Sequence, residues 1–425
     1  MKLHVENFAK IKEADIEIKG ITVIAGENNT GKSTIGKILY CLYYVFKDIK
    51  LKINTERRRS IARALYQTSY FRNKAFPFLE DENDDETTKI IEIINDLTSI
   101  DINTLENYLK KSTIEFSEDT KNLLYDALNF ENKELASLIV KQFFSYEFNN
   151  QFLPLVDTTD ETILNLNIQK SNNTIIFKNK KDIVVNNELN LIKDCIYIDD
   201  PFSIDQMNIK YIEDSSEFLN LLYGRFNRLK HKDFLINRLS KSLKIEEYDL
   251  ISNAILDEKL DKFKSMIKNV IQGDFLEKEN RFVFLDSINN KELELENLST
   301  GVKSLAILLK LLENRDITNK SMIVLDEPEI HLHPKWQLKF AEILILLQKE
   351  FELNIVINSH SPYFISAIQA YSKKYDSISD CKYYLANLSS ENIAFFEDVT
   401  DNPGKIFDIL SEPFDELDKI VYGEE

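Results

Sequence analysis

The sequence predicts an α/β fold with a mostly helical insertion, and three observations lead to this prediction. Short β-rich segments near both ends of the chain alternate with helical patterns. A glycine-bearing turn at residues 26–34 follows one of these segments and precedes an apolar helical pattern. Residues 50–150 contain no glycine and carry long helical periodicities. The two ends are therefore expected to form one α/β head.

The composition suits a large, acidic, folded chain. Of its 425 residues, 43% are hydrophobic, and 27 Phe and 18 Tyr can fill a sizeable core. These values exclude a disordered chain. The net charge of −18 means that any nucleic-acid contact would need a local basic patch. Only nine glycines are present, which excludes collagen-like and linker-rich architectures.

Cysteine usage and hydropathy suggest where the protein resides. Cys41, Cys195 and Cys381 are far apart and lack CxxC spacing, so we expect no disulfide framework and no zinc site. The first residues contain no long apolar segment, and no uncharged apolar run reaches about 18 residues. We therefore expect no signal peptide, no membrane span and a cytoplasmic location.

Each expected element follows from the spacing of its apolar residues. Continuous or alternating apolar runs predict strands, and a period near 3.6 predicts a helix. The predicted strands span residues 2–5, 14–18, 21–25, 195–198, 281–285, 292–295, 321–325 and 355–358, with a hairpin over 172–188. The predicted helices include residues 35–46, 89–97, 120–144 and 305–312, and helical periodicity also runs over 215–272.

These elements divide the chain into five expected parts. Residues 1–50 and 276–425 are the N-terminal and C-terminal parts of the head. Residues 51–164 form a helical insertion, and 206–275 form a helical arm. The hairpin and strand within 165–205 are expected to return to the head.

The strongest motif is a complete phosphate-binding loop. Residues 26–33 read GENNTGKS, the GxxxxGK[ST] pattern, between an apolar strand and a helix. Glycines let the backbone approach phosphate oxygens, and the helix N-terminus favours an anion. Lys32 would reach the β- and γ-phosphates, and Ser33 would bind Mg²⁺. The candidate cofactor-binding residues here are Gly26, Asn28, Asn29, Thr30, Gly31, Lys32, Ser33 and Thr34.

A second motif places two carboxylates after the apolar strand at 322–325. Ligands bind at the carboxyl edge of open α/β sheets. Asp326 is expected to hold Mg²⁺ and Glu327 to act as general base on an attacking water. The alternative is an exposed acidic turn.

Two further motifs complete the candidate site. Ser299 and Gly301 precede the helix at 305–312 and could form a second phosphate-binding helix start, or an ordinary one capped by Ser299. Such a start would reach a P-loop nucleotide most easily across a dimer. His360 follows the strand at 355–358 and could donate to a γ-phosphate, or simply cap the next helix.

In this order, GENNTGKST, LSTGVKS, MIVLDEPEIHLHP and INSHSP resemble the motifs of ABC-type ATPases related to the SMC and RecF heads. The run DEPEIHLHP followed by SHSP is most similar to the OLD family and to phage-defence ATPases of the Septu (PtuA-type) and PARIS systems. This resemblance implies an ABC-type head with a mixed sheet flanked by helices. It also implies ATP and Mg²⁺ as cofactors and a homodimer, or larger homo-oligomer, that encloses ATP.

In that dimer, Lys32 and Ser33 of one chain would face Ser299 and Gly301 of the other. Asp326, Glu327 and His360 would complete each site, and Glu327, His360 and Lys32 would be catalytic. Some features depart from the family pattern. The signature reads LSTGV rather than LSGGQ. No Q-loop glutamine is evident, and Gln67 and Gln206 are the candidates for it. No group of acidic residues typical of a Toprim nuclease follows the ATPase motifs. A separate effector, a nuclease or toxin, is therefore expected.

One basic stretch, Arg225–Lys244, stands against the acidic background, and Arg57, Arg58, Arg59 and Arg63 add a second. Either could contact nucleic acid, although a solvated helix face explains them equally simply. The leading hypothesis is an antiviral ATPase that regulates the effector. The alternatives are a RecF- or SMC-like DNA-binding ATPase of DNA repair and a scaffold that binds ATP without turnover.

Overall fold

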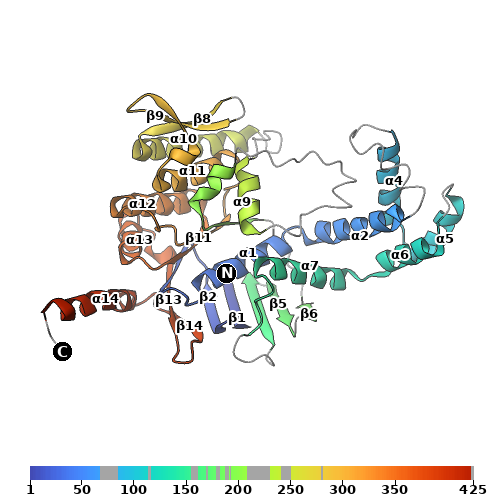
Figure 1. Ribbon diagram of the computed structural model, residues 1–425, viewed down its shortest axis with the longest axis horizontal. Coiled ribbons are helices and arrows are strands. Elements are labelled where there is room, and N and C mark those ends of the chain that lie inside the picture. Colours follow the sequence, from blue (N-terminus) through green and yellow to red (C-terminus); the bar gives the residue numbers. More distant parts are fainter. Residues whose placement is uncertain are drawn as a thin grey trace.

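A large sheet forms the head of the molecule, and an arm of helices extends from one side of it (Figure 1). The computed structural model describes residues 1–67, 85–112, 116–154, 161–168, 171–178, 182–186, 191, 193–207, 230–240, 250–278 and 281–422.

The main sheet draws its strands from the beginning, middle and end of the chain. Its order is β6-β5-β4-β1-β2-β14-β13-β3-β12-β11-β7. The strands are β1 (Lys2–Phe8), β2 (Ile11–Glu17), β3 (Ile21–Gly26), β4 (Thr162–Ile168), β5 (Ser171–Phe177), β6 (Ile183–Asn186), β7 (Cys195–Ile198), β11 (Met322–Asp326), β12 (Asn354–Ser359), β13 (Cys381–Leu388) and β14 (Ala394–Asp398). This mixed α/β architecture confirms the predicted fold class.

The five strands β7, β11, β12, β3 and β13 run parallel. Strand β3 is buried throughout, as are the first four residues of β11. Such continuous burial is expected where helices cover both faces of a parallel sheet. The strands in the order β6-β5-β4-β1-β2 instead pair antiparallel, each with its neighbour.

Helices cover the two faces with separate apolar cores. Val23 of β3 packs in the core with α11 (Thr300–Glu313), α12 (Pro334–Phe351) and α13 (Pro362–Lys374). Its neighbour Ile24 packs in the opposite core with α1 (Lys32–Phe46) and α7 (Asn132–Glu147). This division follows from the alternation of side chains along a strand.

The first face also contacts α9 (His231–Ser240) and α10 (Leu250–Ile271). A short helical turn, η2 (Pro201–Gln206), contacts both α9 and α11. The last helix, α14 (Gly404–Tyr422), extends away from the body and carries an exposed apolar end (Figure 1). None of the described helices is both long and apolar enough to span a membrane.

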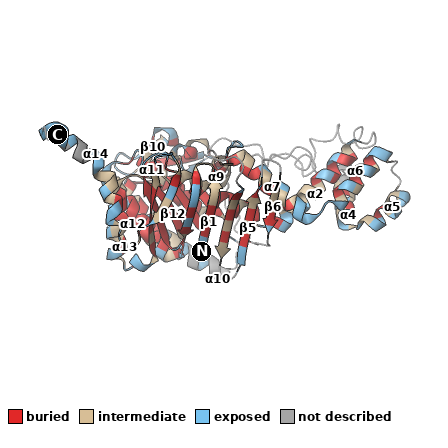
Figure 2. Cartoon of the chain, turned by 90° about the horizontal axis from the view of Figure 1, so that it is seen from below, coloured by how far each residue is buried: buried red, intermediate tan, exposed pale blue. Residues whose placement is uncertain are grey.

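The arm has a small core of its own. It consists of α2 (Ile49–Tyr66), α4 (Asp85–Ser99), α5 (Ile102–Lys111) and α6 (Glu118–Asn129). Figure 2 shows buried residues between these helices, away from the main sheet. They include Leu65, Leu97 and Leu124. The helical character expected for residues 50–150 is therefore present in the described part of this segment.

Four elements cross the expected part boundaries, and α2 and η2 do so by only one or two residues. Strand β4 begins at Thr162, before the expected boundary at 164, and the sequence analysis did not identify it. Strand β8 (Gly273–Lys278) crosses the boundary at 275. It pairs with β9 (Arg281–Asp286), which pairs with β10 (Lys291–Glu294), in a separate three-stranded sheet. The predicted strands at 281–285 and 292–295 therefore exist but lie outside the main sheet.

Candidate active site

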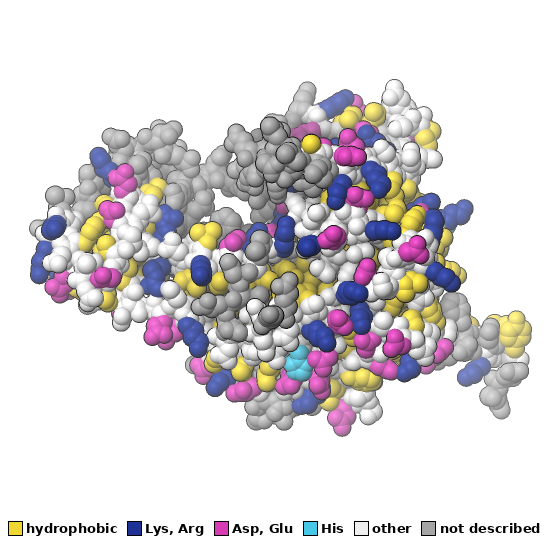
Figure 3. Space-filling model, turned by 180° about the vertical axis from the view of Figure 1, so that it is seen from behind, with side chains coloured by type: hydrophobic (Ala, Val, Ile, Leu, Met, Phe, Trp, Pro, Cys, Tyr) yellow, Lys and Arg dark blue, Asp and Glu magenta, His cyan; other side chains and the backbone are white. Residues whose placement is uncertain are grey.

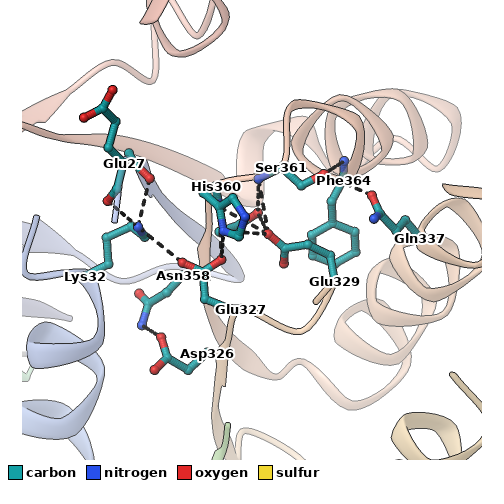
Figure 4. A network of polar contacts seen from close by, with 12 residues as sticks. Glu27, Lys32, Asp326, Glu327, Glu329, Gln337, Asn358, His360, Ser361 and Phe364 are labelled. Carbon is teal, nitrogen blue, oxygen red and sulfur yellow. Dashed lines mark hydrogen bonds and ion pairs between the residues drawn. The ribbon is translucent and has the colours of Figure 1, made fainter. Parts of the chain in front are cut away.

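The candidate site lies where three parallel strands end at one edge of the sheet. Asp326 of β11 is opposite Asn358 of β12, and Ser359 of β12 is opposite Ala25 of β3. Because parallel strands share one carboxyl edge, the P-loop and the two later motifs meet there. Figure 4 shows their side chains pointing toward one another.

The backbone of residues 26–31 forms the tight loop that the motif predicts. Gly26 and Gly31 have φ values of 151° and 90°, and Asn29 has a φ of 67°. A Cβ atom at Gly26 would lie 2.3 Å from the carbonyl oxygen of Ala386, so no side chain fits there. The Thr30 hydroxyl donates to the Glu27 carbonyl at 2.8 Å and closes the loop.

The ammonium of Lys32 is directed into this loop. It donates to the carbonyl oxygens of Gly26 at 2.8 Å and Glu27 at 2.7 Å. It also lies 3.2 Å from a carboxylate oxygen of Glu327. Lys32 is only 4% exposed, so an anion that enters here meets a cation already stripped of most of its water.

The carboxylate of Asp326 accepts three hydrogen bonds. The Ser33 hydroxyl donates to its Oδ1 at 3.0 Å, and the Asn358 amide donates to the same oxygen at 2.8 Å. The Tyr197 hydroxyl donates to Oδ2 at 2.8 Å. A hydroxyl and a carboxylate side by side at a helix N-terminus form the hard oxygen environment that Mg²⁺ prefers, so these residues fit that ion.

Glu327 occupies an unusual backbone conformation. Its φ is 49°, in the left-handed region, and its N–H donates to the Asn358 carbonyl at 2.9 Å. The side chain lies between Lys32 and His360, whose Nδ1 is 2.5 Å from Glu327 Oε2. Strained residues of this kind cluster at functional sites, so the carboxylate is held in place at some backbone cost.

Glu329, like Tyr197 and Asn358, is a site residue that sequence reasoning missed. It is 3% exposed, and one carboxylate oxygen accepts from the Ser359 hydroxyl at 2.5 Å. The same oxygen accepts from the backbone N–H groups of His360 at 3.1 Å and Ser361 at 3.2 Å. Burial raises the pKa of Glu329 to about 7, and the nearby Glu327 carboxylate adds to the rise. Glu329 therefore anchors the His360 loop.

Ser299 and Gly301 stand apart from this group. Ser299 is the N-cap position of α11, and Gly301 lies against Trp336, where a Cβ atom would come within 2.9 Å of the indole ring. Among the described residues, no hydrogen bond or ion pair joins either of them to the P-loop. The structure thus groups Lys32, Ser33, Asp326, Glu327 and His360 but leaves the signature residues outside.

The described cations of the basic stretch are engaged within the head. Lys232 pairs with Asp200 at 2.7 Å, and Arg238 pairs with Asp194 at 2.7 Å and with Asp316 at 2.8 Å. Lys230 donates to the side-chain oxygen of Asn149 at 2.8 Å. The remaining cations of this stretch, Arg225, Arg228, Lys241 and Lys244, lie outside the described residues.

The second basic stretch also has an internal role. The guanidinium of Arg57 donates to the carbonyl oxygens of Leu128 at 3.0 Å and Phe130 at 2.7 Å, at the end of α6. On the face seen in Figure 3, cations lie interspersed with acids. Arg57, Lys232 and Arg238 thus make contacts within the chain, whereas the simpler interpretation of these stretches expected a solvated helix face.

Behind Asp326 lies a buried charged cluster around His231. His231 is 6% exposed; its Nδ1 is 2.5 Å from Glu147 of α7, and its Nε2 is 2.8 Å from Asp199. Burial lowers the pKa of His231, but the hydrogen bonds to Asp199 and Glu147 outweigh burial and raise it to about 9. The imidazole is therefore charged at neutral pH.

This cluster predicts a pH-dependent stability. Because the pKa of His231 rises from 6.5 to about 9 on folding, its contribution is complete below pH 6.5 and is lost as pH rises through 9. The loss amounts to up to about 3 kcal/mol. Chemical unfolding at several pH values would measure it. Lys37 also acts electrostatically on Glu147 and Asp199, and the rings of Tyr40 and Tyr197 contact the His231 ring. These three residues are the same in wild type and in the variant that tests the prediction.

Glu147→Gln is the matched variant, because it keeps a hydrogen-bonding group but removes the charge that raises the pKa. Its stability deficit relative to wild type should shrink as pH rises toward 9. Two parallel stability curves over this range would contradict the prediction.

Comparison with known proteins gives this geometry a family. A family model described as an AAA ATPase domain matches residues 1–365. The chain belongs to the AAA ATPase domain family. The P-loop, Asp326 and Glu327 described above all fall within the matched residues of this ATPase domain.

The relatives agree with the resemblance to defence ATPases. The retron Vc95 probable ATPase of Vibrio cholerae is 24% identical over 418 residues, which are 93% of this chain and 76% of that protein. The Septu protein PtuA of Bacillus thuringiensis is 27% identical over 218 residues. That match spans 48% of this chain and 49% of PtuA, so the chain covers about half of this relative.

Among solved structures, the SMC head domain from Thermotoga maritima is similar with a TM-score of 0.40 and 12% identity. The alignment covers 94% of this chain and 98% of that one.

Proposed function

We propose that this AAA ATPase domain protein binds and hydrolyses ATP with Mg²⁺, dimerises around the nucleotide and regulates a separate effector in antiviral defence. The observation that carries the proposal is the meeting of Lys32, Ser33, Asp326, Glu327 and His360 at one sheet edge. Three motifs far apart in the sequence converge there, and each supplies a group that phosphate chemistry requires.

Each residue would have a distinct role. Lys32 and the N–H groups of the P-loop would bind the β- and γ-phosphates, and Ser33 and Asp326 would hold Mg²⁺, which supplies charge neutralisation when bound. Glu327 would accept a proton from the attacking water. His360, hydrogen-bonded to Glu327, would keep that carboxylate oriented and contact the terminal phosphate.

The dimer would bring Ser299 and Gly301 to the partner's nucleotide. This idea is supported by their separation from the P-loop of their own chain, since a phosphate-binding helix start unused in cis is free to act in trans. Gly301 allows α11 to lie close to α12, so the N-terminus of α11 remains a compact backbone surface.

The defence role is supported by the retron and Septu relatives. A nuclease or toxin encoded separately would be the effector. A DNA-repair ATPase of the RecF type would need an exposed basic surface, and Arg57, Lys232 and Arg238 of the two basic stretches are engaged within the chain. The acidic net charge of −18 also disfavours it.

Mixing two inactive variants tests the dimer with nucleotide shared between chains. Lys32→Ala disables one half of each site and Ser299→Arg the other half. A mixed dimer contains one intact site, so an equal mixture should recover roughly a quarter of wild-type ATP hydrolysis. Mass in solution should double when wild type binds ATP and Mg²⁺. A mixture that stays inactive, together with a wild type that stays monomeric with ATP, would overturn this part of the proposal.

Co-purification with the neighbouring gene product tests the effector, with and without ATP. Retention of a partner in only one nucleotide state would support regulation. Salt-sensitive DNA binding by the isolated chain would instead favour the repair alternative.

A further inference from the structure

The hydrogen bonds to Asp326 come from three elements, and one of them lies outside every recognised motif. Ser33 belongs to the P-loop helix and Asn358 to the strand before His360. Tyr197 belongs to β7, the edge strand beside β11. It is 1% exposed, and its hydroxyl donates to Asp326 Oδ2 at 2.8 Å.

The ring of Tyr197 is fixed from behind by the His231 cluster. The ring centroids of Tyr197 and His231 are 4.6 Å apart. His231 is in turn held on both nitrogens, by Glu147 of α7 and by Asp199 just after β7, and its backbone N–H donates to Glu147 at 3.1 Å. A continuous set of contacts thus runs from α7 to Asp326.

We propose that Tyr197 is a positioning residue for the cation site, and that His231 and Glu147 hold it in place. The proposal rests on the proposed function only for the identity of the ion, Mg²⁺ with bound nucleotide. The hydroxyl fixes Oδ2 and thereby orients Oδ1 toward Ser33. These contacts also connect α7, the helix that follows the arm in sequence, to the orientation of the Asp326 carboxylate.

The burial of Tyr197 makes its hydroxyl hard to replace. A water molecule cannot easily reach a position enclosed by the sheet, α1 and His231, so Asp326 would lose a hydrogen bond outright. Groups that hydrogen-bond to metal ligands commonly change metal affinity by about 10- to 100-fold when they are removed. An effect of this size is expected for Tyr197.

Tyr197→Phe isolates the hydroxyl, and Tyr40→Phe is the matched control. Tyr40 packs against the same ring pair, with its centroid 6.1 Å from that of Tyr197, and is equally buried. Its hydroxyl has no hydrogen-bond partner in the described part of the chain. Both variants therefore remove one buried hydroxyl from the same core, but only one touches Asp326.

The readout is binding of a non-hydrolysable ATP analogue, measured by calorimetry with Mg²⁺ and with a chelator. The ratio of the two affinities is the gain in analogue affinity that Mg²⁺ provides, and it is measured without any turnover. In Tyr197→Phe this gain should fall about tenfold or more while the metal-free affinity stays unchanged. In Tyr40→Phe both values should match wild type. Glu147→Gln, which keeps every tyrosine, should reduce the gain by a smaller factor than Tyr197→Phe, because Glu147 acts on Asp326 only through His231 and Tyr197.

The outcomes separate this inference from the proposed function. A wild type that binds the analogue equally with and without Mg²⁺ would defeat the proposed cofactor. A wild type with a clear gain, retained in full by both Tyr197→Phe and Glu147→Gln, would overturn the positioning role. If Tyr197→Phe does not fold, the gain in Glu147→Gln alone decides.

Discussion

Glu327→Gln is expected to lower ATP turnover by about 10²- to 10⁴-fold while ATP binding is retained or strengthened. Glutamine has the same shape, so it can keep the hydrogen bond from His360, but it cannot accept a proton from water. The carboxylate is also a negative charge 3.2 Å from Lys32, the group that would bind the γ-phosphate. Its removal relieves repulsion with the phosphate, so the nucleotide should dissociate more slowly. The measurement is single-turnover hydrolysis together with nucleotide retention.

Glu106→Gln is a suitable control for this experiment. Glu106 lies on the arm and pairs with Lys110 at 3.5 Å on an exposed surface. Glu106→Gln also replaces a carboxylate by an amide, but far from the sheet edge, so it should leave turnover unchanged. Wild-type turnover in Glu327→Gln would remove Glu327 as the general base and direct attention to Glu329, the other carboxylate beside His360.

Glu329→Ala is expected to affect both stability and turnover. One carboxylate oxygen of Glu329 accepts three hydrogen bonds, so alanine leaves the Ser359 hydroxyl without its acceptor. The backbone N–H groups of His360 and Ser361 each lose one of two acceptors and keep only Glu327 and the Ser359 hydroxyl. A loss of roughly 3 kcal/mol in the free energy of unfolding is expected. Turnover should fall at least about tenfold, since His360 would lose its support. Thermal unfolding and steady-state hydrolysis would measure the two effects.

Glu329→Gln distinguishes an anchoring role from a charge requirement. The amide oxygen can accept the same three hydrogen bonds, and a neutral side chain resembles the protonated form that a pKa near 7 makes accessible. This variant should retain most of the turnover and stability. A glutamine variant as inactive as alanine would show that the charge itself is needed, and the anchoring role would be wrong.

Local motifs made part of this site predictable from the sequence. The P-loop, the Asp326–Glu327 pair and His360 each follow a buried strand, and parallel strands bring their ends together. Residues that depend on long-range packing were not predictable in this way. Tyr197 meets Asp326 across 129 residues, and only the placement of β7 next to β11 makes that contact possible.

Glu329 and β4 were missed for different reasons. Glu329 sits in a run of acids and histidines, where nothing local distinguishes a buried carboxylate from an exposed one. Strand β4 did carry a signal, since Leu164 and Leu166 alternate with Asn165 and Asn167. This alternation with a period of two is typical of a strand, so it could have predicted β4 as a further strand of the sheet. The strands β13 and β14 were also not identified, although β13 is largely buried.

The position of β3 in the sheet has a consequence for how the chain is made. The strand that carries the P-loop is made long before both of its neighbours, β12 and β13, which end at Ser359 and Leu388. A nascent chain therefore exposes an apolar strand with two unpaired edges until these two strands have been made. Closure of the sheet around β3 must wait for them, and such distant pairing is slow. Assembly of the nucleotide site thus follows the synthesis of β12 and β13, which complete the first motif.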